Sequence, residues 1–264
     1  MPVDVRFLSW PAAVQLLVLI GIFFLLSSAG AVAFRYLRGR SGSAPSNETI
    51  TVILGIYGAI YGALLAFVIV IAWDDLNAAK GRVDAEAASL AAVARDAEFL
   101  PAETRERISG DMKEYLTYTV NVEWNKMRMG KVPSASNPNL NDMLATLRKY
   151  KPTSAREIAD YQRMRTDLTS TIGDRRARIG DSGEQLPDLL RYFIFGGAIC
   201  VILLCCCFSV SSVFEQAVLL AAVSVLLASS LLVVVGLNHP FVGDISVSPE
   251  AYYRGILSQY LPRG

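Results

Sequence analysis

Small residues recur at helical spacing within the stretch GIYGAIYGALLAF, which runs from Gly55 to Phe67. Gly55, Gly58, Gly62 and Ala66 lie three or four residues apart, so on a helix they form one flat ribbon. Lipid provides no hydrophobic force that draws helices together, and such ribbons allow another helix backbone to approach closely. The spacing therefore predicts a helix-packing surface made of these four residues.

Tyrosine side chains share the same stretch. Tyr57 and Tyr61 are four residues apart and fall on a common helix face. A tyrosine hydroxyl inside a membrane needs a hydrogen-bond partner, either another helix or water. Two interpretations follow. Either the tyrosines bond to neighbouring helices, or the helix lines an aqueous path in an oligomer, with Tyr57, Tyr61, Leu65 and Phe67 forming its constriction.

Two carboxylates follow an aromatic residue in Trp73-Asp74-Asp75. As a structural feature, the tryptophan lies at the lipid boundary and the carboxylates belong to a solvated helix turn. As a functional feature, carboxylates repeated by symmetry form a negative ring at a pore mouth, which attracts cations rather than chloride.

The chain contains a single histidine, His239, which follows the last apolar block in Asn238-His239-Pro240. Because proline stops a helix, His239 can cap the last free carbonyls, and it can also act as a pH sensor at the membrane edge. Glu48, preceded by Asn47, comes before the second apolar block, where a carboxylate favours a helix N-terminus.

Enzymatic chemistry has little support in the sequence. There is no phosphate-binding loop and no nucleophile elbow, and one histidine is too few for the usual metal clusters. The four cysteines, Cys200, Cys205, Cys206 and Cys207, fall on different faces of one apolar helix, so they form neither a disulfide framework nor a metal-ligand set. We therefore expect a protein that is not an enzyme and that has no cofactor and no metal.

Four apolar blocks must position these residues. Hydrophobic residues make up 53% of the 264 residues and charged residues only 19%, and the apolar residues are concentrated in blocks long enough to cross a bilayer. The blocks are Pro11 to Phe34, Ile50 to Trp73, Leu189 to Val213 and Gln216 to Leu237. Ala31-Val32-Ala33 has the form of a signal-peptidase site, but the positive region before it is thin, so we interpret the first block as a transmembrane helix.

The region between the second and third blocks, residues 74–188, is charged and nearly neutral. It holds eighteen Lys or Arg and nineteen Asp or Glu, which makes it a soluble domain and excludes a nucleic-acid patch. The resulting domains are residues 1–73 with two membrane helices, residues 74–188, residues 189–238 with two further membrane helices, and a tail of residues 239–264.

The soluble region shows helical periodicity and no strand pattern, so the predicted fold class is all-α. Apolar residues at steps of three and four continue the second block as one helix face: Val83, Ala87, Leu90, Ala94 and Ala97. A second helix is predicted from Ala102 to Met129, with an inner face of Ile108, Met112, Tyr115, Thr119 and Val122.

Capping signals start the next helices. Asn137-Pro138 predicts a short helix that ends near Tyr150, and Ser154-x-x-Glu157 has the form of a capping box for a longer one. In the tail, Ser248-Pro249-Glu250 predicts an amphipathic helix, and its few basic residues favour packing on the soluble bundle over the membrane surface.

Basic residues near the block ends indicate the orientation. If the soluble domain is cytoplasmic, the inside holds Arg6, Lys80, Arg82, Arg175, Arg176, Arg178, Arg191 and Arg254, and the outside holds Arg35, Arg38 and Arg40. The turn from Ser209 to Glu215 has no basic residue, which suits an outside loop. We therefore predict that both termini and the soluble domain are cytoplasmic.

Through two groups of residues, the chain resembles a known bacterial family, the bestrophin-like domain, which is a domain of unknown function. The first group is Glu48, Gly58, Tyr61, Leu65, Ala66, Phe67, Trp73, Ala79, Val83, Glu86, Ala87 and Leu90. The second is Leu237-Asn238-His239-Pro240-Phe241-x-Gly243 with Val247-Ser248-Pro249-Glu250. Together they span nearly the whole chain.

The resemblance implies a plan distantly similar to that of bestrophin channels. Those are pentameric anion channels with four membrane helices per subunit and a pore lined by the second. By this resemblance the chain is a homo-oligomeric, pentameric channel for inorganic ions, an anion in the first place, in a bacterial inner membrane. No acidic run matches the calcium clasp of bestrophins. The alternative is a non-conducting scaffold or accessory subunit whose helical domain binds a partner protein.

Overall fold

The computed structural model describes residues 3–41, 46–183, 186–208 and 212–261. These residues form helices joined by turns and include no strand, which confirms the all-α fold. The chain divides into two compact units. We call residues 6–74 and 185–238 the membrane unit, and residues 75–184 with 239–264 and the first five residues the bundle unit.

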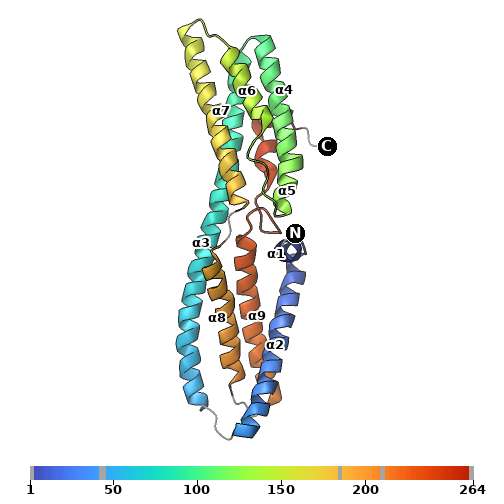
Figure 1. Cartoon of the computed structure of the whole chain (residues 1–264), viewed down its shortest axis with the longest axis vertical. Coiled ribbons are helices and arrows are strands. Elements are labelled where there is room, and N and C mark those ends of the chain that lie inside the picture. The colour runs from blue at the N-terminus through green and yellow to red at the C-terminus, as the bar shows by residue number, and fades with distance from the viewer. Residues whose placement is uncertain (1–2, 42–45, 184–185, 209–211, 262–264) are drawn as a thin grey trace. The chain divides into compact units, whose positions relative to one another are not determined.

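The membrane unit holds the four apolar helices (Figure 1). They are α2 (Ala12–Ser41), the first part of α3 (Asn47–Asp96), α8 (Asp188–Cys206) and α9 (Val213–Leu237), and a short α1 (Val3–Leu8) precedes them. Each is long and apolar enough to cross a bilayer, so the chain is a multi-pass membrane protein.

The ends of the last two spans differ from the prediction. α8 ends at Cys206 instead of continuing to Val213, and α9 begins at Val213 instead of Gln216. Apolar composition continues through both helix ends, so hydropathy alone could not place them. The predicted outside turn at residues 209–215 falls partly outside the described residues, as do the side chains of Arg38 and Arg40.

Small residues allow close packing at two points of the membrane unit. On α2, the Cys206 thiol of α8 donates to the carbonyl of Ser27 at 3.1 Å, and a Cβ placed on Gly30 would lie 2.9 Å from that sulfur. On α8, a Cβ placed on Gly197 would lie 2.3 Å from Cε2 of Tyr61. Because each glycine lacks a side chain, it leaves room that the side chain of a neighbouring helix fills.

The bundle unit consists of the rest of α3 from Asp75 and the helices packed on it. These are η1 (Ala97–Phe99), α4 (Ala102–Tyr118), the π-helix η2 (Thr119–Glu123), α5 (Trp124–Arg128), α6 (Pro138–Lys149), α7 (Ala155–Asp181), η3 (Pro249–Tyr253) and η4 (Gly255–Gln259). The predicted cap at Asn137 is present, and the capping box of Ser154 and Glu157 is complete. The predicted inner face is buried at Val83, Ala87, Leu90 and Ala94 of α3 and at Ala97 of η1.

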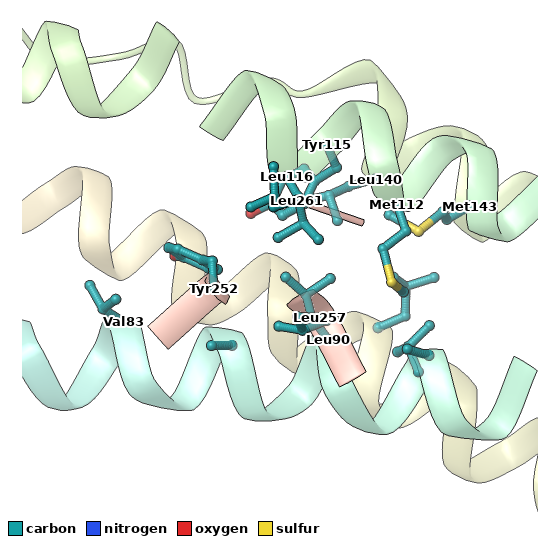
Figure 2. Packing of buried hydrophobic residues seen from close by; sticks show 14 of the residues in the cluster. Val83, Leu90, Met112, Tyr115, Leu116, Leu140, Met143, Tyr252, Leu257 and Leu261 are labelled. Atoms are coloured by element: carbon teal, nitrogen blue, oxygen red, sulfur yellow. The ribbon is translucent and has the colours of Figure 1, made fainter. Parts of the chain in front are cut away.

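The C-terminal tail packs in the bundle core, as predicted, but not as an α-helix. It forms two 3-10 helices separated by Arg254, and Gly255 then adopts a φ of 58°, a left-handed conformation that favours glycine. Figure 2 shows Tyr252 and Leu257 of these turns beside Val83 and Leu90 of α3. Helical spacing of apolar residues did not reveal this break.

The contact between Gly197 and Tyr61 gives a test of the membrane unit. We expect Gly197→Ala to lower the melting temperature in detergent, because the new methyl group displaces the Tyr61 ring and its hydrogen bond. Gly196→Ala is the matched control, since a Cβ there has no neighbour within 4 Å. It should be neutral or stabilising by up to about 1 kcal/mol. Equal melting temperatures for the two variants would refute the tight contact.

Candidate functional site

One stripe of α3 faces the other helices of the membrane unit. Its members recur every three or four residues and are buried or half-buried: Ile50, Leu54, Tyr57, Tyr61, Leu65, Val68 and Ala72. The Tyr61 hydroxyl donates to the carbonyl of Ile194 on α8 at 2.9 Å, and its ring stacks with that of Tyr57 at 6.3 Å between centroids. Tyr61 thus has an intrachain partner of the kind that the first interpretation required.

The small-residue ribbon of α3 has no such cover. Apart from its own helix turns, no described part of the chain comes within 4 Å of a Cβ built on Gly55, Gly58 or Gly62; Gly58 is half-buried, and Gly55, Gly62 and Ala66 are exposed. In the single chain this ribbon is therefore an open surface rather than a seat for the chain's own helices.

The four residues predicted to form a constriction do not share one face. Leu65 is buried beside Tyr61, whereas Phe67 is 67% exposed. Phe67 follows Leu65 by two positions, which is a rotation of about 200° around an α-helix. Its side chain therefore points away from the Tyr61 stripe. In the single chain, intrachain packing occupies Tyr57, Tyr61 and Leu65, whereas Phe67 lies on the exposed side of the helix.

The residues predicted at the helix ends are spread along α3 and beyond. Ser46 caps α3, since its hydroxyl accepts from the amide of Thr49 at 3.2 Å. Glu48 is exposed in the first turn, where the helix dipole favours a carboxylate. At the other end of the apolar stretch, Trp73, Asp74 and Asp75 are exposed.

His239 lies in the bundle unit and is buried. The C-cap position of α9 is Asn238, and its side-chain oxygen accepts from the amide of Leu186 at 2.7 Å. The carbonyl of His239 accepts from the amide of Val242 at 3.0 Å, which begins the turn into the tail.

Sequence reasoning missed a buried chain of charges in the bundle unit. Arg178 donates to Glu86 through Nε at 2.8 Å and to Glu123 through Nη2 at 2.9 Å, and Arg175 donates to the other oxygen of Glu123 at 2.5 Å. Glu86, Glu123 and Arg178 have no exposed side-chain area. The four residues, Glu86, Arg178, Glu123 and Arg175, form what we call the ion network.

Aromatic groups surround this network. The Tyr115 hydroxyl donates to Oε1 of Glu86, and the Arg178 guanidinium lies 5.5 Å from the centre of the Trp124 ring. Burial opposes the charge of Arg178, but the Glu86 carboxylate raises its pKa well above the usual value. Burial and then the Glu86 charge raise the pKa of Tyr115 and of Tyr252 well above 10.

A π-helix explains why Glu123 was missed. A regular α-helix from Ala102 to Met129 would turn Val122 inward, but the extra residue of η2 rotates the later positions. Glu123, Trp124 and Met127 are buried in consequence, and Val122 is only half-buried. Arg175 and Arg178, counted above as basic residues near a span end, are likewise neutralised inside the bundle.

Metal binding has no support in the described part of the chain, where no three His, Cys, Asp or Glu side chains gather to hold an ion. Cys205 and Cys206 are buried, Cys207 is half-buried and Cys200 is exposed. Their burial fits the role of small apolar residues.

The chain matches the model of one protein family, described as the Bestrophin-like domain, over residues 21–252. The match begins inside α2, covers the other three membrane helices whole, and ends inside η3 of the bundle unit. Comparison with curated proteins and with solved structures gave no match.

Alkaline pH should destabilise the bundle unit through the two buried tyrosines. Their pKa in the folded state lies above the unfolded value of about 10, so the stabilisation is complete below pH 10 and is lost as pH rises further. Each tyrosine contributes a slope of up to about 1.4 kcal/mol per pH unit. Urea unfolding of the bundle unit, followed by tyrosine and tryptophan signals at pH 8 and pH 10.5, measures this decline.

Phenylalanine variants separate the two tyrosines. Both Tyr115→Phe and Tyr252→Phe should reduce the alkaline decline. At pH 8, Tyr115→Phe should cost about 1.5–3 kcal/mol, because it removes a hydrogen bond to a carboxylate. Tyr252→Phe should cost less, because the Tyr252 hydroxyl makes no hydrogen bond of normal geometry among the described residues. An unchanged pH dependence in both variants would contradict this account.

Proposed function

The chain belongs to the bestrophin-like domain family, and from that premise we propose that it is an oligomeric membrane ion channel whose pore is lined by α3. The observation that carries the proposal is the division of α3 into a covered and an open side. Tyr61 and Leu65 fill the interior of the chain's own membrane unit, while Gly55, Gly62, Ala66 and Phe67 are exposed.

The open side of α3 suits contact with further copies of the chain. A helix that contacted only lipid would gain nothing from a ribbon of glycines, since leucine satisfies lipid equally well. A ribbon of glycines instead allows a second helix backbone to approach closely. The ribbon and Phe67 lie on different flanks, because Gly62 and Phe67 differ by five residues, or about 140°. In a ring of subunits, the ribbon then packs against a neighbour and Phe67 faces the axis.

Phe67 is accordingly the residue to which we assign the constriction. Its ring is exposed in the single chain, and apolar rings repeated around an axis make a gate that closes by excluding water. Leu64 and Ile71 are exposed three residues before and four residues after it on the same flank, so they extend the apolar segment.

Charge near the pore mouth bears on ion selectivity. The family resemblance favours an anion, whereas the exposed carboxylates of Asp74 and Asp75, repeated by symmetry, favour cations. We place the bundle unit on the cytoplasmic side, because more basic residues lie near the spans on that side even after the buried Arg175 and Arg178 are left out. Ions therefore pass the carboxylates on the cytoplasmic side of the constriction.

Recordings from purified protein in planar bilayers test the proposal. We expect Phe67→Ala to raise the single-channel conductance, because it widens an apolar constriction. Phe195→Ala is the matched control, since Phe195 is an exposed phenylalanine on a different span and should leave the conductance unchanged. The reversal potential in a salt gradient distinguishes anion from cation flow, and a Phe67→Ala variant as silent as the parent protein would favour a scaffold.

A further inference from the structure

A loop after α5 displays apolar side chains among basic ones. Met129 is 37% exposed and Val132 is 57% exposed, although both are apolar. Arg128 and Lys131 alternate with them and are exposed as well. We call the segment from Arg128 to Val132 the basic loop.

The basic loop is held in one conformation from inside the bundle. Gly130 adopts a φ of 64°, and the amide of Lys131 donates to the carbonyl of Lys126 at 2.9 Å, which closes the end of α5. Arg175 then binds the carbonyls of Ser134 at 2.9 Å and Ala135 at 2.8 Å. Since Glu123 fixes Arg175, the ion network sets the path of the chain that follows the loop.

The basic loop lies against the end of α7. A Cβ placed on Gly183 would lie 3.0 Å from Cγ2 of Val132. The membrane helix α8 begins at Asp188, five residues after Gly183. Along the chain, only a short segment therefore joins Gly183 to the first residue of a span.

We propose that the basic loop is a lipid-binding element. Met129 and Val132 insert into the headgroup region, and Arg128 and Lys131 bind the phosphates of anionic phospholipids. Apolar side chains flanked by cations are suited to this interface, where one part is buried in the acyl boundary and the other meets negative charge.

Lipid suits this loop better than a second copy of the chain does. Two apolar side chains offer far less area than a stable protein interface requires. The cations of the loop complement anionic headgroups. The proposal is independent of ion conduction, and it assigns a role to the ion network as the internal support of the loop.

Depth-dependent quenching tests the proposal in the full-length protein. A fluorescent label on Val132→Cys is measured in vesicles that contain brominated lipid, either neutral phosphatidylcholine alone or a mixture with phosphatidylglycerol, after subtraction of the parent protein's signal. We expect the label to be quenched, and at least twofold more strongly in the anionic vesicles. A label on Phe99→Cys is the matched control, since Phe99 is 65% exposed but lies beside Glu98, and it should stay unquenched.

Removing the positive charges of the basic loop separates binding to anionic lipid from other reasons why a label at position 132 could be shielded from solvent. Arg128→Gln combined with Lys131→Gln, in the labelled protein, should abolish the difference between neutral and anionic vesicles. Both side chains are exposed, so the fold should be retained, and circular dichroism checks this. A label at position 132 that is unquenched in both vesicle types would overturn the proposal. So would a label with the same emission and solvent protection in detergent as in vesicles, which would indicate coverage by another copy.

Discussion

The packing of Tyr61 against Gly197 decides which side of α3 is available for contact with another copy of the chain or for lining a pore. The tyrosine ring occupies the space that a side chain on Gly197 would need, and its hydroxyl bonds to the carbonyl of Ile194. This contact orients α3 about its own axis within the membrane unit. Once Tyr61 and Leu65 face inward, helix geometry leaves the glycine ribbon and Phe67 outside. The proposed oligomer and pore both follow from that orientation.

A second constraint acts in the bundle unit, where the ion network joins α3, the π-helix and α7. Removing one member of a buried ion pair typically costs about 3–5 kcal/mol, because the partner is left charged and unpaired. Glu123 and Arg178 therefore make the bundle intolerant of changes in register between these helices. The same network holds Arg175 against the chain beyond the basic loop. The ion network thus fixes the geometry of the helices that it joins.

Local signals predicted much of this structure, and non-local contacts account for what they missed. Apolar length gave the four spans, and Ser154 with Glu157 gave the start of α7. The inward face of α3 depends on Gly197, more than a hundred residues away, so no local pattern could separate Tyr61 from Phe67. Glu123 became buried because one extra residue in η2 changed the helical phase. A charged residue within a helix is ordinarily assumed to face solvent, so the sequence alone did not indicate that Glu123 is buried.

The number of chains in the lipid-embedded protein tests the central claim most directly, namely that the open ribbon of α3 meets another copy. Native mass spectrometry of the protein in nanodiscs counts the subunits. We expect a ring of four or more chains that Gly62→Leu disrupts, while Gly196→Leu, an equal addition at another open glycine, leaves it intact. A monomer in the parent protein, or a ring that tolerates Gly62→Leu, would contradict the account.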